Sequence, residues 1–118
     1  MSRLSARVLG GIALLLCLQV QAQPVSYQQQ IKPLFERYCN ACHSGWFPQG
    51  GLRLNSLENI AEGGNNGAVL FAGEPDKGTL INFIRVVPGR FSIMPPGPTA
   101  VDAASFELIR RWIEQGAR

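Results

Sequence analysis

Apolar residues recur at helical spacing in three separated stretches of the chain. In the first stretch they fall at positions i, i+3, i+4 and i+7, namely Ile31, Leu34, Phe35 and Tyr38. This stripe predicts a helix that is capped by Ser26 and runs to about Cys42. Because Pro33 lies inside the stripe, it should kink the helix or mark its first turn, which leaves the residues before it irregular.

Two further stripes lie in the second half of the chain. One is expected to open at Pro75 and Asp76 and to end by Pro88, with Leu80, Ile81, Phe83 and Ile84. The other should begin near Thr99, where Thr99 and Asp102 resemble a capping box. Its residues facing the core are Val101, Leu108, Ile109 and Trp112, and Gly116 should end it.

Helix caps, turns and glycine- or proline-rich loops are predicted between these stretches. Ser56 has the position of a cap for a short helix that Gly63 closes, and a turn should follow at residues 65–67. Residues 44–53 and 90–98 are rich in glycine and proline, and residues 68–71 read as packed coil. The pattern therefore predicts an all-α domain of about four helices with long loops.

The first 22 residues have the pattern of a secretory signal peptide. Arg3 and Arg7 precede an uncharged apolar run over residues 8–18, and Ala22 stands where cleavage is expected. The run is too short to span a bilayer, which takes roughly 20 helical residues. We therefore expect a signal peptide over residues 1–22, a single domain over 23–118, export to the periplasm and no membrane segment in the mature chain.

Charge gives little reason to expect a nucleic-acid partner. The whole chain has 11 Lys+Arg and 8 Asp+Glu, for a net charge of +3. Two of the basic residues, Arg3 and Arg7, belong to the leader, so the mature chain carries about +1. No cluster of basic and aromatic residues remains.

The cysteines and the single histidine gather in one pentapeptide. Of the three cysteines, Cys17 leaves with the leader, and Cys39 and Cys42 stand two residues apart and directly before His43. This spacing is the c-type haem attachment pattern. It predicts one haem c per chain, held covalently through two thioethers, with His43 on the iron and a backbone carbonyl, in Phe47-Pro48, on the other ring nitrogen.

Three other uses of these residues compete with haem attachment. A structural zinc site needs four ligands, and only three Cys and His side chains remain in the mature chain. A thioredoxin-like pair should open a helix after a strand, whereas this pair follows a helix. A plain disulfide in an oxidising compartment stays open, although it gives no reason for the adjacent His43.

Met94 is the candidate for the second axial ligand. Thioether sulfur suits haem iron, and Met94 is the one methionine left after the leader is removed. It lies beside two prolines in a loop, away from any helix stripe. The competing interpretation is that Met94 simply fills space in the core.

A series of short motifs closely resembles the planctomycete-type cytochrome c domain family. The motifs are IKPLF (31–35), CNACH (39–43), GGLRLNS (50–56), GGNNG (63–67), PDKGTLI (75–81), MPP (94–96) and RWIEQGA (111–117). The resemblance implies a cytochrome c-like helical fold around covalent haem, with His43 proximal and Met94 distal. The chain departs from the family pattern at Asn55, where aspartate is usual, and in the longer stretch over residues 88–93.

Other side chains were assigned by their chemistry. Arg53 could pair with a haem carboxylate or remain a solvated loop charge. Five side chains are expected to wall the haem: Trp46, Phe47, Phe71, Phe91 and Ile93. Three more should form the contact between the first and last helices: Phe35, Tyr38 and Trp112.

These features favour an electron carrier rather than an enzyme. A His/Met iron has no open position, and no nucleophile–base pair, carboxylate dyad or phosphate loop occurs elsewhere. The expected partners are redox proteins, a dehydrogenase or quinol-oxidising complex on one side and a terminal oxidase or reductase on the other. The alternatives are a haem-based gas sensor or peroxidase-like protein, in which Met94 leaves the iron, and a thiol redox protein without haem.

Overall fold

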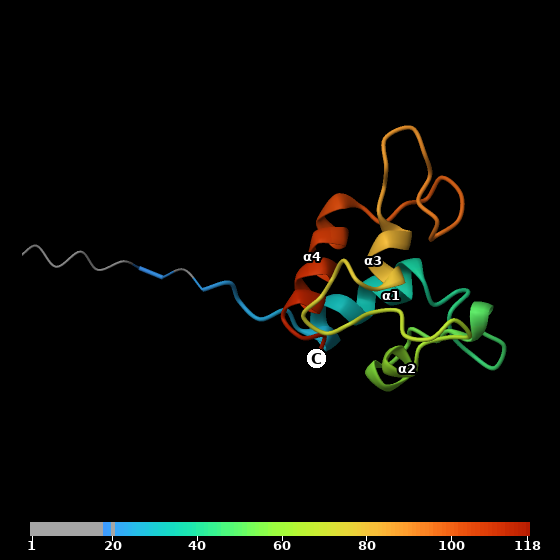
Figure 1. Ribbon diagram of the computed structural model, residues 1–118, viewed down its shortest axis with the longest axis horizontal. Helices are drawn as coiled ribbons and strands as arrows, with labels where there is room; N and C mark the ends of the chain where they lie inside the picture. Colours follow the sequence, from blue (N-terminus) through green and yellow to red (C-terminus); the bar gives the residue numbers. More distant parts are fainter. Residues whose placement is uncertain (1–17, 20) are drawn as a thin grey trace, which may run out of the picture.

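The computed structural model describes residues 18–19 and 21–118. Within them the chain forms four α-helices, α1 (Lys32–Tyr38), α2 (Leu57–Glu62), α3 (Thr79–Ile84) and α4 (Ala103–Glu114) (Figure 1). A π-helical turn, η1 (Tyr27–Ile31), leads into α1, and a 3-10 turn, η2 (Gln49–Gly51), lies in the loop after it. The described residues contain no strand, only an isolated bridge between Gly64 and Gly67, so the all-α class is confirmed.

The predicted leader falls mostly outside this description. Residues 1–17, with Cys17 and most of the apolar run, are not among the described residues. No described helix has both the length and the apolar character that a membrane crossing requires.

The first helix begins where the position of Pro33 predicted, with an irregular turn before it. The Ser26 hydroxyl accepts a hydrogen bond from the Gln29 N–H at 3.2 Å, and Pro33 stands in the first turn of α1, after the irregular η1 turn. The predicted end at Cys42 is wrong, because α1 ends at Tyr38. The N–H groups of Cys39 and Asn40 both donate to the Phe35 carbonyl, each at 2.9 Å, and this shared acceptor ends the helical ladder.

The short helix α2 matches its prediction at both ends. The Ser56 hydroxyl accepts a hydrogen bond from the Asn59 N–H at 3.1 Å, as an N-cap does. Gly63 ends the helix with φ +73°, a conformation that favours glycine. A side chain at Gly63 would also meet the carbonyl of Gly67, so the turn at 64–67 can fold back closely.

Helices α3 and α4 each start later than the sequence predicted. α3 starts at Thr79 rather than Pro75, because Gly78 packs its backbone against Val69, where a Cβ would clash, and residues 75–78 form turns. α4 starts at Ala103 rather than near Thr99. Its cap is Asp102, whose carboxylate accepts from the Ser105 N–H at 2.9 Å and which therefore fixes the first turn without help from Thr99.

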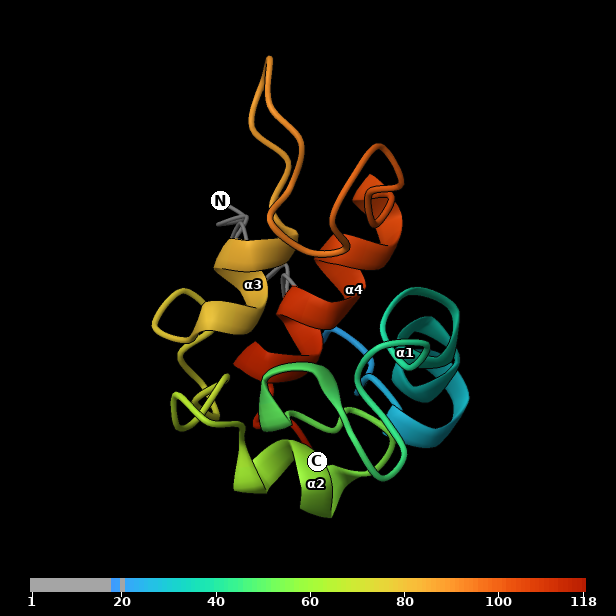
Figure 2. The ribbon, with the colours of Figure 1, turned by 90° about the vertical axis from the view of Figure 1, so that its right-hand side faces the viewer.

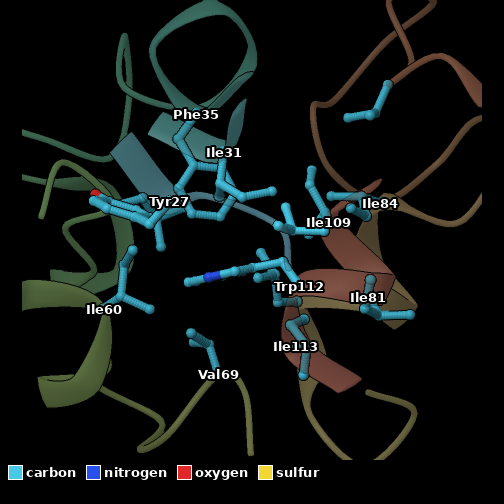
Figure 3. Packing of buried hydrophobic residues seen from close by; sticks show 14 residues of the cluster. Tyr27, Ile31, Phe35, Ile60, Val69, Ile81, Ile84, Ile109, Trp112 and Ile113 are labelled. Carbon is cyan, nitrogen blue, oxygen red and sulfur yellow. The ribbon is translucent and has the colours of Figure 1, made fainter. Parts of the chain in front are cut away.

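The core lies where α4 crosses η1 and α1 (Figure 3). The Phe35 and Trp112 rings meet edge to face with centroids 6.0 Å apart, and Tyr27 lies 5.7 Å from Trp112 on another side. The Tyr38 hydroxyl donates to Asp102 at 2.8 Å. The predicted contact between the first and last helices is confirmed. Six side chains are essentially fully buried: Ile31, Phe35, Ile81, Ile109, Trp112 and Ile113.

The segment before η1 is tied to the end of α4. The Val25 N–H donates to Gln115 Oε1 at 2.8 Å, and Gln115 Nε2 donates to the Gln23 carbonyl at 3.3 Å. One glutamine side chain therefore satisfies two backbone groups of the entering chain. In Figure 1 this entering segment and the C-terminal end of α4 lie together, away from η2 and from the loop after α3.

Candidate functional site

A cavity of about 330 Å³ opens between the end of α1, η2, the 64–69 segment, α3 and the loop after α3. Figure 2 looks at the molecule from the side on which these segments meet. Most of the wall is apolar. The apolar side chains in it are Leu52, Leu54, Ala68, Val69, Leu80, Phe83, Ile84, Met94, Pro95 and Pro96.

The CNACH pentapeptide supplies one side of the cavity. Cys39, Cys42 and His43 all line it. The N–H groups of Cys42 and His43 both donate to the Cys39 carbonyl, at 3.1 and 2.9 Å, so the peptide turns tightly after α1. Cys39 is half-buried, Cys42 is exposed, and both are free thiols. The turn therefore presents two unpaired sulfurs and an imidazole to one space.

Burial sets the chemistry of the first thiol. Removal of Cys39 from solvent raises the pKa of its thiol to about 11, so Cys39 is protonated at neutral pH. A catalytic thiol–disulfide pair depends on the opposite shift, because the thiolate is the attacking species. Cys39 is thus poorly suited to act as the attacking thiol, and it faces an apolar cavity.

His43 is oriented by a backbone carbonyl. Its Nδ1 lies 3.2 Å from the Leu52 oxygen and donates to it in the tautomer that carries the proton there. This leaves Nε2 without a proton, the form in which imidazole ligates a metal. The sequence predicted such a carbonyl but named the wrong one, in Phe47-Pro48. The chain folds back further along, since the Leu54 N–H donates to the His43 carbonyl at 2.8 Å.

Met94 reaches the same cavity from a distant part of the chain. Its side chain is half-buried and lines the wall together with Pro95 and Pro96. The Met94 N–H donates to the Phe83 carbonyl at 2.8 Å, which fastens the loop after α3 to the end of that helix. The fold therefore brings together Cys39, Cys42, His43 and Met94.

Arg53, the fifth candidate, does not line the cavity. Its Nε donates to the Gly45 carbonyl at 2.7 Å and one terminal nitrogen donates to the Trp46 carbonyl at 3.4 Å. Both contacts are to backbone carbonyls of the loop that follows His43. The arginine braces this loop in the structure.

The sequence-based prediction of which large apolar side chains line the cavity is wrong. None of Trp46, Phe47, Phe71, Phe91 and Ile93 lines the cavity, and Trp46 and Phe47 are 90% and 97% exposed. The wall instead includes one face of α3, with its members at i, i+3 and i+4, namely Leu80, Phe83 and Ile84. That spacing was visible in the sequence, but the pattern cannot tell whether an apolar face meets another helix or a cavity.

A family model described as planctomycete cytochrome C matches residues 39–98, just over half of the chain. The chain belongs to this family. No curated protein and no solved structure matches it significantly. The matched segment begins at Cys39, extends past Met94 and leaves out α1 and α4. It therefore contains the whole set of cavity residues except Tyr38.

Membership in a cytochrome c family makes this a haem-binding, electron-transfer domain. The residues present fit haem in chemistry and surroundings. The cavity offers two free thiols, an imidazole with one nitrogen already engaged, a thioether from another segment and an apolar lining. When bound, haem supplies one-electron chemistry at its iron.

Proposed function

We propose that the protein is an exported, periplasmic electron carrier with one haem c. Cys39 and Cys42 hold the haem through thioethers, and His43 and Met94 ligate its iron. The observation that carries the proposal is the convergence of these four side chains, from two distant segments, on one apolar cavity. Export fits the leader-like residues 1–22, because cytochrome c attachment takes place outside the cytoplasm.

The residues of the chain each have a part in carrying an electron. The carbonyl of Leu52 fixes the His43 ring and increases its donor strength. The thioether of Met94 is a weak donor, so it favours the ferrous state and raises the potential. The apolar wall keeps water from the iron. A site with both axial positions filled exchanges electrons and does not bind substrate. The partners of the protein are therefore redox proteins, such as a dehydrogenase and a terminal oxidase or reductase.

Mass spectrometry of the purified mature protein tests attachment and export together. We expect cleavage after Ala22 and the mass of one added haem, with a haem-stained band on a denaturing gel. An intact leader argues against export, and a mass that fits only a Cys39–Cys42 disulfide removes the basis of the proposal.

Met94 is tested by substitution in the haem-loaded protein. We expect the unmutated ferric protein to show the weak far-red charge-transfer band of thioether-ligated haem, and the ferrous protein to resist carbon monoxide. Met94→Ala should abolish the band, lower the midpoint potential and open the iron to added ligands. Met94→His should keep six ligands at a lower potential, since nitrogen favours ferric iron.

The same measurement separates the carrier from the alternatives. Rapid, stoichiometric uptake of carbon monoxide by the unmutated ferrous protein would mean that Met94 does not hold the iron. The protein would then be a gas sensor or peroxidase-like protein with an open position. A colourless purified protein would favour the thiol redox protein.

A further inference from the structure

Haem carries two carboxylates on the edge of the macrocycle opposite to the two positions that thioethers occupy. The residues assigned so far, Cys39, Cys42, His43 and Met94, leave these carboxylates without partners. A charged group next to an apolar cavity needs hydrogen bonds or an opposite charge, because its desolvation is otherwise costly.

The cavity offers no opposite charge. Among the described residues that line it, none is lysine, arginine, aspartate or glutamate, and the titratable side chains are Tyr38, Cys39, Cys42 and His43. The first three stand at the end of α1, on the thioether side, and Tyr38 donates to Asp102. Arg53, the nearest cation in sequence to the cysteines, is engaged by the carbonyls of Gly45 and Trp46.

What the cavity does offer is uncharged donors that are exposed and have no protein partner. The polar, uncharged side chains in its wall besides Tyr38 are Gln49, Asn65, Asn66 and Thr79. None of these four side chains makes a hydrogen bond within the described residues, whereas three asparagines outside the cavity, Asn55, Asn59 and Asn82, do. The Asn59 amide donates to Asn55 Oδ1 at 2.8 Å, and Asn82 donates to the Gly78 carbonyl at 2.9 Å.

Three of the four lie on the far side of the cavity from the cysteines, where the haem carboxylates would lie. In Figure 2 the teal end of α1, which carries the cysteines, and the yellow-green turn at 64–67 lie on opposite sides of the view, with α3 on the side of the turn. Asn65 and Asn66 belong to that turn and Thr79 to the start of α3. Gln49, on η2, lies between the two sides.

The turn is held firmly enough to present its side chains. The Gly64 N–H donates to the Gly67 carbonyl at 3.1 Å, and the Gly67 N–H donates back at 2.9 Å. The Asn65 N–H donates to the Gly50 carbonyl at 2.9 Å. Gly51 lies directly beside the Asn65 amide oxygen, where any Cβ would collide with it, so glycine leaves the space that Asn65 occupies.

We propose that Asn65, Asn66 and Thr79 bind the two haem carboxylates as neutral hydrogen-bond donors. This inference rests on the proposed function, since it needs haem in the cavity. Neutral donors satisfy the carboxylate oxygens without cancelling their charge. The negative charge therefore acts on the iron, and the midpoint potential responds strongly to any charge added at these positions.

The experiment uses haem-loaded protein and isosteric substitutions. Asn65→Asp and Asn66→Asp replace a donor by a second carboxylate at unchanged volume, and Thr79→Val removes a hydroxyl. Asn55→Asp is the matched control, because it adds the same charge at an exposed position that does not line the cavity. Arg53→Gln removes the one cation that the sequence suggested for this role. The readouts are the midpoint potential and the propionate bending mode in the resonance Raman spectrum.

We expect Asn65→Asp and Asn66→Asp to lower the potential by several times the control shift, and each to move the propionate mode. Thr79→Val should move the mode with a smaller change in potential, and Arg53→Gln should leave the mode unchanged and shift the potential by about as much as the control. Soret and far-red bands like those of the unmutated protein show that the iron ligands are retained. Equal shifts in Asn65→Asp, Asn66→Asp and Asn55→Asp overturn the inference, as does a mode that moves only in Arg53→Gln. Absence of covalent haem would instead overturn the proposed function.

Discussion

Trp112 and Trp46 have the same side chain, yet Trp112 is 1% exposed and Trp46 is 90% exposed. Trp112 stands where α4 meets η1 and α1, and its neighbours Phe35 and Tyr27 enclose it. Trp46 stands in the loop after His43, which Arg53 holds through backbone carbonyls. Trp112 belongs to the helical region, whose interior is filled by side chains, and Trp46 belongs to the loop beside the cavity.

The helical region is filled by its own side chains, while the cavity region is not. Ile31, Phe35 and Ile113 have no exposed surface, whereas Phe83, in the cavity wall, is 37% exposed. Small domains often rely on a cofactor because their own apolar area is limited. The side chains of α1, α3 and α4 therefore pack a scaffold by themselves, and the proposed haem would complete the packing around the cavity.

Removal of both thiols should have the largest effect on the contrast between the helical region and the cavity region. In Cys39→Ala/Cys42→Ala we expect no covalent haem, a low yield and loss of fixed tertiary structure around the cavity, because the cavity wall has nothing to pack on. Hydrogen exchange with mass spectrometry should show prompt exchange over residues 45–71 and 85–98, with residual protection in α1 and α4. A variant that unfolds cooperatively and protects both regions equally would show that the two regions do not differ.

The two tryptophans allow a matched comparison in the haem-loaded protein. Trp112→Ala should lower the free energy of unfolding by about 3–5 kcal/mol, because it leaves a cavity among buried rings. Trp46→Ala should change it by no more than about 0.5 kcal/mol, since the ring is exposed. Denaturant unfolding followed by the Soret band and by far-UV circular dichroism measures both. Comparable losses would mean that Trp46 is covered once haem is bound.

The smallest effect concerns the cap that joins α1 to α4. Hydrogen bonds from the backbone N–H and the hydroxyl of Ser105, and then from the Tyr38 hydroxyl, lower the pKa of Asp102 from 3.8 to about 2. A lowered folded-state pKa stabilises the protein above the ordinary pKa, and this stability is lost as the pH falls from about 4 towards 2.

Thermal unfolding across this pH range tests the cap. Asp102→Asn keeps a capping side chain but cannot titrate, so its stability should fall less steeply between pH 4 and 2 than that of the unmutated protein. Tyr38→Phe removes one donor and raises the folded-state pKa of Asp102 towards 3.8, so the decline should be smaller and should end at a higher pH. Identical slopes in all three proteins would show that Asp102 is not held in its charged form by these donors.

The helical region was largely predictable because its signals are local. The stripe from Ile31 to Tyr38, the Ser56 cap and the pairing of Phe35 with Trp112 all follow from spacing and side-chain type. The late starts of α3 and α4 were not predictable in the same way. One depends on Gly78 packing against a distant backbone, and the other on Asp102 acting as a cap by itself.

The sequence predicted the four chemically distinctive side chains that line the cavity, and it did not predict the apolar walls. The CNACH spacing, the single histidine and the remaining methionine identified four side chains that the fold brings to one cavity. The walls depend on which segments meet, and loop aromatics such as Trp46 and Phe47 gave a false signal. Large apolar side chains are usually buried, so their exposure could not be predicted from residue type.

The glutamine tie between Gln23, Val25 and Gln115 has a practical consequence. It joins the two ends of the folded domain on one side of the molecule, remote from η2 and from the loop after α3 (Figure 1). A linker attached ahead of Gln23 or after α4 would leave from that same side. An affinity tag or a thiol anchor placed there would fix the protein to an electrode with the cavity turned towards solution.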